Sequence, residues 1–414
     1  MPPSEVPLQD ADAHGAALFQ PYRARDVLAR NRVVIAPMQQ YSAVDGHATD
    51  WHVVHLGRFA LGGAGIVFVE STAVEERGRN AHGDTGLWKD SQIEPLRRVA
   101  KVLKDNGAVP AIQLGHTGRK GALQAPWAGH SHLNADDAAR GEAAWQVVGP
   151  SALPVGDGGW QVPHALSSAE VKDVVKAWGD AAHRAAQAGF EVLEVHGAHG
   201  YLIHQFLSPV ANVRTDEYGG SMDNRHRFAL EVAEAVRARW PAHLPLFWRI
   251  SLADLDHELS MDELVSLLMG LKSRGVDVID CSSGGGISSY PTDGPRVARG
   301  LEYRANDGQR IKAMTGMDVM AVGLIIDPHL AEAILNADQA DLIAIAREAM
   351  FNPNWALHAQ MSLGANTDYD LWPRQHSSYL AKRAAMADPL RNIVLQRDAS
   401  RMLAATPRTS RLAA

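Results

Sequence analysis

The chain has a single cysteine, Cys281, among 414 residues. An intrachain disulfide is therefore excluded, and we expect a reducing compartment, with the cytoplasm as the default location. The sequence also lacks an apolar run long enough for a membrane helix, and its N-terminus lacks the basic start and apolar core of a secretory signal. We therefore expect no membrane partner.

Positive charge is not in excess either. The 40 Lys and Arg residues against 47 Asp and Glu residues give a net charge of -7, and no basic stripe is visible, so we expect no nucleic-acid partner. A hydrophobic content of 46% is enough for a large core. The length fits one barrel-sized domain with extensions better than three small domains.

Short apolar runs alternate with segments of helical spacing along most of the chain. The eight runs that predict strands are residues 33–36, 65–70, 109–114, 190–195, 246–251, 276–281, 318–322 and 340–346. Helices are predicted between them, for example over 168–188, 224–239 and 261–274. Eight such units indicate an α/β protein with a (β/α)8 TIM barrel. A doubly wound sheet is the alternative, but no Gly-x-Gly-x-x-Gly follows the first run.

Two segments fall outside the repeat. Residues 122–163 are rich in Gly, Pro, Asp and His, and predict a long loop with a small hairpin over the third unit. Residues 364–414 form a C-terminal extension, whose last residues, 404–414, we expect to be disordered. We therefore expect a barrel over residues 1–363 and a separate extension.

The fourth run leads into His196-Gly-Ala-His199-Gly-Tyr201. Two imidazoles three residues apart can both donate to one oxygen atom, and the phenol beside them is a weak acid. A single histidine here would more often be a packed core residue. Three such side chains where a strand ends favour a site.

Barrel enzymes build their sites at the carboxyl ends of the strands, so the residues at the other ends are candidates too. These are Pro37, Met38, Gln39, Gln40, Tyr41, Ser71, Thr72, Gln113, His116, Arg249, Ser282, Ser283, Gly284, Gly323, Ala346 and Arg347. The last three ends are small or glycine-rich and carry one arginine, which suits a phosphate group. Taken singly, Gly323 could equally be a turn and Arg347 a solvent-facing helix start.

Several motifs resemble the Old Yellow Enzyme family, whose members are FMN-dependent ene-reductases. They occur in family order at 36–41, 112–120, 196–209, 214–228, 248–251, 280–284 and 346–350, and the resemblance covers roughly 31–360. The His-x-x-His form, the Pro-Met-x-x-Tyr entry and the tryptophan-containing loop are similar to the xenobiotic reductase, or thermophilic-like, branch.

The resemblance implies FMN as cofactor and a role for each matching position. Gln113 and Arg249 would bind the pyrimidine edge of the flavin. The isoalloxazine would lie against Ala36, Pro37, Met38, Gln39, Ser71 and His196. The phosphate would lie among Ser283, Gly284, Gly323, Ala346 and Arg347.

The same resemblance implies the reaction. Hydride would pass from NADH or NADPH to FMN, and from flavin N5 to the β-carbon of an α,β-unsaturated carbonyl compound. His196 and His199 would hold the carbonyl oxygen, Tyr201 would protonate the α-carbon and Tyr41 would add a donor near the substrate. We expect a small-molecule substrate, no metal and a homo-oligomer.

Two positions depart from the family. Gln39 stands where this branch usually has a cysteine that touches the flavin, which leaves the flavin potential open. The tail reads Pro373-Arg374-Gln375-His376 instead of Pro-x-Gln-Tyr, so a residue that enters a neighbouring subunit's site would be Arg374 or Trp372.

Three other functions stay open at this point. A metal-dependent hydrolase could use His196, His199 and His204 as ligands, although the first run supplies no ligand. A flavin-binding protein with little turnover would follow if Gln39 has abolished catalysis. A related flavin oxidoreductase could act on a CoA thioester or an amine. The Asp216-Glu-Tyr-Gly-Gly220 run indicates a structural turn.

Overall fold

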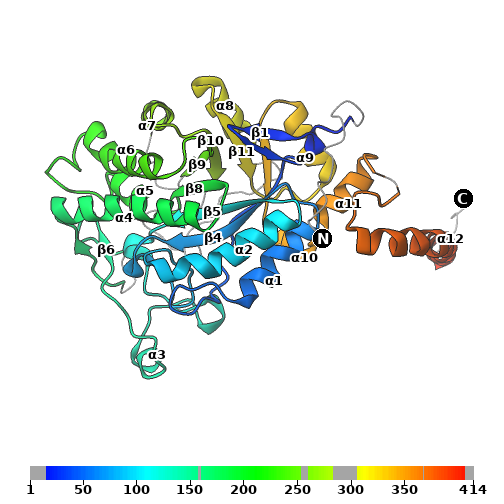
Figure 1. Ribbon diagram of the computed structural model, residues 1–414, viewed down its shortest axis with the longest axis horizontal. Helices are drawn as coiled ribbons and strands as arrows, with labels where there is room; N and C mark the ends of the chain where they lie inside the picture. Colours follow the sequence, from blue (N-terminus) through cyan, green and yellow to red (C-terminus); the bar gives the residue numbers. More distant parts are fainter. Residues whose placement is uncertain (1–14, 157–159, 253–259, 283–304, 367, 406–414) are drawn as a thin grey trace, which may run out of the picture.

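Figure 1 shows the computed structural model, which describes residues 15–156, 160–252, 260–282, 305–366 and 368–405. Eight parallel strands form a closed barrel in the order β10-β11-β12-β3-β4-β5-β8-β9. They are β3 (Val33–Ile35), β4 (Ile66–Ala73), β5 (Val109–Gly115), β8 (Val192–Gly197), β9 (Leu246–Ser251), β10 (Val278–Ser282), β11 (Asp318–Val322) and β12 (Leu342–Ile345). The predicted (β/α)8 barrel is confirmed.

Helices follow the strands and surround the barrel (Figure 1). They are α1 (Asp50–Leu61), α2 (Ile93–Asp105), α4 (Ser168–Gln187), α6 (Met222–Arg239), α7 (Met261–Ser273), α8 (Ala305–Thr315), α9 (Pro328–Asn336) and α11 (Trp355–Ser362). Short helices α5 (Leu202–Leu207) and α10 (Arg347–Phe351) begin just after β8 and β12. The predicted start of α4 is confirmed, because the Ser167 hydroxyl accepts from the Glu170 amide and the Glu170 side chain accepts from the Ser167 amide.

The half of the barrel interior near the amino-terminal ends of the strands is apolar. Buried side chains from all eight strands meet there, for example Ile66, Phe68, Phe247, Met320 and Leu342. A two-stranded hairpin of β1 (Tyr22–Ala24) and β2 (Val27–Ala29) packs against the same cluster. The barrel is therefore filled and closed at its amino-terminal end, and only the carboxyl ends of the strands can open onto a ligand.

The described part of the segment 122–163 contains two short helices and one strand. The helices are η5 (Pro126–Ala128) and α3 (Ala135–Ala139), and α3 lies below the barrel in Figure 1. β6 (Val148–Gly149) pairs in parallel with β7 (His164–Ala165). The chain between them crosses over instead of turning back, as a parallel pair requires. The prediction of a small hairpin agrees with the antiparallel bridge between Leu123 and His132. Backbone hydrogen bonds from Gln124 to Ser131 and from Leu133 to Ala122 flank this bridge.

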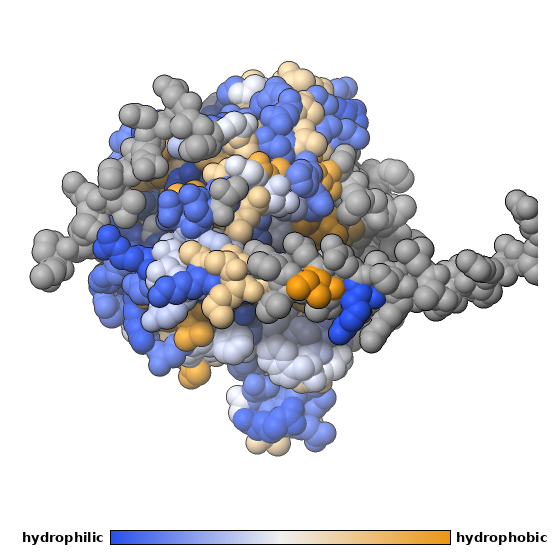
Figure 2. Space-filling model, turned by 90° about the vertical axis from the view of Figure 1, so that its right-hand side faces the viewer, coloured by the Kyte–Doolittle hydropathy of each residue, from blue (hydrophilic) through white to orange (hydrophobic). Residues whose placement is uncertain are grey.

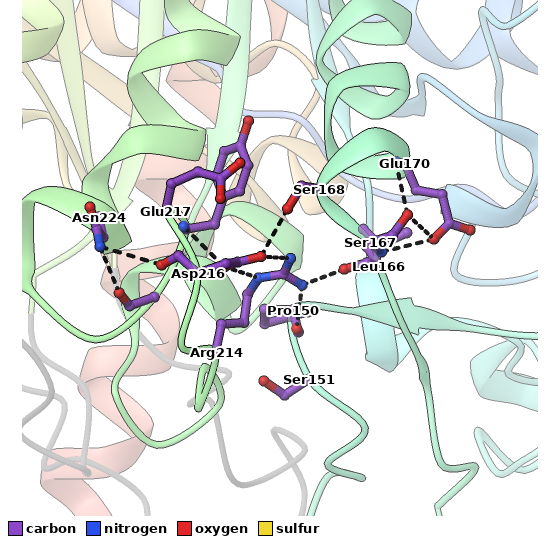
Figure 3. A network of polar contacts seen from close by, with 12 residues as sticks. Pro150, Ser151, Leu166, Ser167, Ser168, Glu170, Arg214, Asp216, Glu217 and Asn224 are labelled. Carbon is purple, nitrogen blue, oxygen red and sulfur yellow. Dashed lines mark hydrogen bonds and ion pairs between the residues drawn. The ribbon is translucent and has the colours of Figure 1, made fainter.

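Arg214 ties this long segment to the helices (Figure 3). Its guanidinium donates to the carbonyl oxygens of Pro150 and Leu166 and forms an ion pair with Asp216. Asp216 also accepts from the Ser168 hydroxyl, 2.9 Å away, at the start of α4. These contacts agree with a structural role for the 216–220 turn.

The C-terminal extension forms the helix α12 (Arg374–Ala405), which projects from the barrel in Figure 1. Trp372 is only 8% exposed and packs with Leu357 and Tyr369 of its own chain. Of the two residues proposed to enter a neighbouring subunit's site, only Arg374 is exposed and could reach another subunit. Figure 2 shows the face of the molecule that lies on the right in Figure 1. The coloured part of this face is mostly hydrophilic and has small, separate hydrophobic patches. Among the described residues, no helix is both long enough and apolar enough to cross a membrane.

Candidate active site

A polar layer lies on top of the apolar barrel interior, toward the carboxyl ends of the strands. The register of neighbouring strands places its side chains next to one another. Gln113 pairs with Glu194, His196 pairs with Arg249, and Arg249 pairs with Asp280. Directly paired residues point to the same face of a sheet. All five side chains are buried, so strands far apart in the sequence bring them together inside the barrel.

Ser71 enters this layer because β4 contains a bulge. The register shifts between Val69 and Ser71, so the side chain of Glu70 leaves the barrel and lies 3.6 Å from His52 of α1. Ser71 then pairs with Gln113. Gly115 makes room for it, because a Cβ atom at Gly115 would lie 2.1 Å from the Ser71 hydroxyl. Ser71 and Gln113, each predicted to contact a flavin, are thus side by side.

His196 and His199 lie together, but the strand boundary differs from the predicted one. β8 extends to Gly197, so His196 belongs to the strand and only His199 lies beyond it. The Ala198 amide donates to His196 Nδ1, which places the proton on Nε2. His196 Nε2 lies 3.0 Å from His199 Nδ1, and His199 Nε2 lies 2.8 Å from the Ser282 hydroxyl. The imidazoles therefore form a hydrogen-bonded chain.

Both imidazoles are neutral at physiological pH. Burial lowers the pKa of each well below its ordinary value, and the positive charge of Arg249 lowers it further. A neutral imidazole still has one N–H donor, and it takes no proton from solution. The pair is therefore suited to donate hydrogen bonds to an oxygen on which negative charge develops.

His199 has an unusual backbone conformation with φ of +61°. Side chains hold both sides of this residue, since its amide donates to the Ser251 hydroxyl at 3.0 Å and its carbonyl accepts from the Lys120 ammonium at 3.0 Å. A left-handed conformation is uncommon for residues other than glycine, and such strain is concentrated at functional sites. Sequence reasoning did not predict these two supports.

The phenol of Tyr201 lies beside the histidines, and the phenol of Tyr41 interacts electrostatically with Tyr201. The Tyr201 ring lies 4.7 Å from the His196 ring and 6.5 Å from the His199 ring. The Tyr41 hydroxyl accepts a hydrogen bond from the side-chain amide of Asn80 at 3.4 Å. Burial raises the pKa of both phenols, and the negative charge of Asp84 raises it further. Both hydroxyls therefore stay protonated at neutral pH.

Gln39 links the site to a buried acid. Its amide nitrogen lies 3.4 Å from the Ser71 carbonyl oxygen, and its side chain also donates to Asp84. Asp84 also accepts a hydrogen bond from the backbone amide of Asn80 at 2.6 Å. Burial raises the pKa of Asp84 to about 7, and the bond from Gln39 opposes this rise. A cysteine at position 39 would be a weaker donor to this carboxyl group.

The predicted phosphate site is only partly described. Gly323 has φ of +133°, which L side chains rarely adopt, so glycine is required at the end of β11. Ala346 precedes the first residue of α10, Arg347, whose side chain is exposed. Ser283 and Gly284 lie outside the described residues. The other residues predicted near a flavin ring, Ala36, Pro37 and Met38, directly follow β3, which lies between β4 and β12.

Glu194 and Asp280 complete the layer, and sequence reasoning did not assign them a role. Each is a charged residue inside an otherwise apolar strand, two positions before His196 and Ser282 respectively. Because alternate residues of a strand share a face, this spacing was the available signal.

The chemistry of these side chains favours an organic ligand over a metal. His204, the third proposed ligand, accepts a hydrogen bond from the Gly200 amide on Nδ1, which occupies that lone pair. The amide of Gln113 and the guanidinium of Arg249 suit instead the carbonyl and N–H groups on the edge of a heterocycle.

Comparison with known proteins identifies the family. Residues 17–366 match the sequence model of the NADH:flavin oxidoreductase / NADH oxidase family. The chain belongs to this family, the Old Yellow Enzyme family. It is therefore an NAD(P)H-dependent flavin oxidoreductase, and the fit between the polar layer and a flavin edge agrees with that activity.

Solved structures show the same fold. Morphinone reductase has 25% sequence identity and a TM-score of 0.69 over 84% of this chain and 90% of its own. The Old Yellow Enzyme homologue from Zymomonas mobilis has 23% identity and a TM-score of 0.66 over 87% of this chain and 98% of its own. 2-Naphthoyl-CoA reductase, in a complex with 2-naphthoyl-CoA, has 24% identity and a TM-score of 0.72 over 84% of this chain. The chain spans about half the length of that reductase, 52%.

Proposed function

We propose that this protein is an FMN-dependent ene-reductase that reduces the activated C=C bond of an α,β-unsaturated carbonyl compound with NADH or NADPH as reductant. The observation that supports this most is the meeting of His196, His199 and Tyr201 beside Gln113 and Arg249. Neutral N–H donors and a protonated phenol thus lie within ring distances of 4.7–6.5 Å, next to donors that suit a flavin edge.

His196 and His199 bind the substrate in this proposal. Their N–H groups hold the carbonyl oxygen and draw electron density from the double bond, which stabilises an enolate as it develops. The charge of Arg249 adds to this effect, because it lies in the same layer beside His196. Tyr41 contributes a further donor at the edge of the site.

Tyr201 supplies the proton. A donor must hold its proton until negative charge appears on the acceptor carbon, and the raised pKa of this buried phenol does so at neutral pH. The same property makes Tyr201 a poor general base. The arrangement therefore suits reduction of a double bond better than proton abstraction from a substrate.

FMN would be held by Gln113, Arg249 and His196 and by the chain at Ala36, Pro37, Met38, Gln39 and Ser71. Gly323, Ala346 and Arg347 would meet its phosphate, together with Ser283 and Gly284 outside the described residues. When bound, FMN supplies the hydride chemistry. The protein supplies orientation, the hydrogen bonds to the substrate and the proton.

A homo-oligomer in the cytoplasm is part of the same proposal. Tyr379, Met386 and Ile393 are exposed on α12 at intervals of seven residues, a spacing typical of helices that pack against one another. Size-exclusion chromatography with light scattering would test it, and a monomer at all concentrations would contradict it.

One second candidate has a specific observation behind it. The structural similarity to 2-naphthoyl-CoA reductase extends over 84% of this chain and makes a CoA thioester an alternative substrate class. The thioester carbonyl would use the same two histidines.

An anaerobic titration tests these proposals. The purified, FMN-supplemented protein should show a flavin absorption band, lose it on addition of NADH or NADPH and regain it on addition of 2-cyclohexenone. Reoxidation by an unsaturated acyl-CoA but not by the enone would favour the thioester alternative. A protein that binds FMN but reacts with neither reductant nor enone would be a flavin-binding protein without turnover.

A further inference from the structure

Two fully buried carboxyl groups, Glu194 on β8 and Asp280 on β10, lie in the polar layer, and the proposed reaction uses neither. Both point into the barrel, since Glu194 pairs with Gln113 and Asp280 pairs with Arg249. Burying two acids side by side is costly unless each has a partner. Their contacts therefore need an explanation.

The contacts form one chain of four side chains. Gln113 Nε2 donates to Glu194 Oε1 at 2.8 Å. Glu194 and Asp280 share a hydrogen bond, and Asp280 Oδ2 lies 3.2 Å from Arg249 Nε. The two groups that suit a flavin edge, Gln113 and Arg249, are thus joined beneath the site through the two acids.

A hydrogen bond between two carboxyl groups requires that one of them carries a proton. Asp280 faces a guanidinium, whereas Glu194 faces a neutral amide, so the proton belongs on Glu194. Burial and the charge of Asp280 both raise the pKa of Glu194 well above its ordinary value. The charge of Arg249 opposes the rise at Asp280, which stays the anion of the pair.

This chain fixes the orientation of both donors. Because Glu194 accepts from the amide nitrogen of Gln113, the carbonyl oxygen of that amide is turned to the other side, where it can accept from a ligand. The guanidinium of Arg249 is held at Nε by Asp280 and at Nη2 by the Ser282 hydroxyl, 3.1 Å away. Within the described residues, its contacts leave Nη1 for a ligand.

We propose that Glu194 is a positioning residue for the flavin: it sets the amide of Gln113 and, through Asp280, the guanidinium of Arg249 in the orientations that meet the pyrimidine edge. This inference rests on the proposed FMN site. Proton sharing also limits the negative charge of the acid pair to one. A second negative charge there would oppose the charge that a reduced flavin ring accumulates.

Two substitutions separate this role from simple packing. Glu194→Gln keeps an acceptor for Gln113 and a donor for Asp280, so it imitates the protonated acid. Glu194→Leu removes both at similar volume, and Glu194→Met serves if the leucine variant does not fold. We expect Glu194→Gln to bind FMN within about twofold of the parent and Glu194→Leu to bind it about tenfold more weakly.

FMN affinity is measured by titrating the apoprotein and following the quenching of flavin fluorescence. The reduction potential is measured by equilibration with a reference dye, and we expect a lower potential in Glu194→Leu because the donors to the reduced ring are no longer held. A Gln113→Leu/Glu194→Leu double variant should lose less FMN affinity than the sum of the losses in the two single variants, because part of the effect of Glu194 acts through Gln113.

Three results would overturn the inference. Glu194→Leu with parental affinity and potential but reduced thermal stability would show a purely structural residue. Glu194→Gln as defective as Glu194→Leu would show that the ionised acid is required. Strictly additive losses in the double variant would show that Glu194 does not act through Gln113. A parent protein that binds no FMN would instead remove the proposed function, which is a distinguishable outcome.

Discussion

His196 donates to His199 across 3.0 Å, and His199 donates in turn to Ser282. The two imidazoles thus form a chain instead of a fork. For both to hold one substrate oxygen, the His199 ring must turn away from His196, which frees the Nε2 hydrogen of His196. Ser282 would then lose the hydrogen bond from His199 and keep the one from Arg249.

Removing both imidazoles should weaken substrate binding much more than FMN binding, because Gln113 and Arg249 would still hold the flavin. For His196→Ala/His199→Ala we expect the binding of a para-substituted phenol to weaken by about 1.5–3 kcal/mol for each hydrogen bond lost to its charged oxygen. Equilibrium titration of the flavin absorption band measures it. His199→Asn is the matched control, since asparagine tolerates positive φ and restores an N–H donor. Unchanged phenol affinity in the double variant would exclude this assignment.

Tyr201→Phe should separate the two half-reactions. The substitution keeps the ring against His196 and removes only the hydroxyl, so flavin reduction by NAD(P)H should continue at nearly the parental rate. Reoxidation by an enone should slow by about 10²–10⁴-fold, the usual contribution of a positioned acid. Stopped-flow absorbance measures both steps, with Tyr41→Phe as the control. If the enone reoxidises the flavin of Tyr201→Phe as fast as that of the parent, Tyr201 is not the proton donor and Tyr41 becomes the candidate.

Ser251 should stabilise the fold and the phenol site by accepting a hydrogen bond from the backbone amide of His199. Ser251→Ala removes the acceptor of the His199 amide, so we expect the free energy of unfolding to fall by about 0.5–1.5 kcal/mol and phenol binding to weaken. Ser251→Thr keeps the hydroxyl and should behave like the parent. Urea unfolding and phenol titration of both variants check this. Equal behaviour of the alanine and threonine variants would show that the strained loop needs no such support.

The barrel could be predicted from sequence because each strand carries its own local pattern. β9 and β11 have the predicted bounds, since residues 246–251 and 318–322 are short, mostly apolar runs. β8 begins later and ends later than predicted, because its pairing with β9 continues to Gly197. Strand ends depend on such pairing between distant segments, and one segment alone does not show it.

The site was predictable in its residues but less so in its contacts. The spacing of His196, His199 and Tyr201 predicted that these side chains share one site, and the structure brings them together. The spacing of Glu194 and His196 shows only that the two side chains share a face, whereas the partner of Glu194 depends on the register between β5 and β8. The bond between Gln39 and Asp84 joins two separate loops and has no local sequence signature. The parallel pairing of β6 and β7 was missed for the same reason.

Asp84 makes the stability of the fold depend on pH. Burial raises its pKa from the ordinary 3.8 to about 7, so between these values the folded protein binds a proton that the unfolded chain has lost. The free energy of unfolding should therefore fall as the pH rises from about 4 to about 7, by up to roughly 4 kcal/mol from this group.

Asp84→Asn is neutral at every pH and should not show this part of the decline, while its carbonyl oxygen can still accept from the Asn80 amide. Urea unfolding of parent and variant at about pH 5 and about pH 8 measures the difference. Gln39→Leu is the complementary variant, because without the amide that donates to Asp84 its pKa should rise further and the decline should move to higher pH. If the parent and Asp84→Asn lose stability in parallel over this range, another group is responsible, and Gln39 has no electrostatic partner in Asp84.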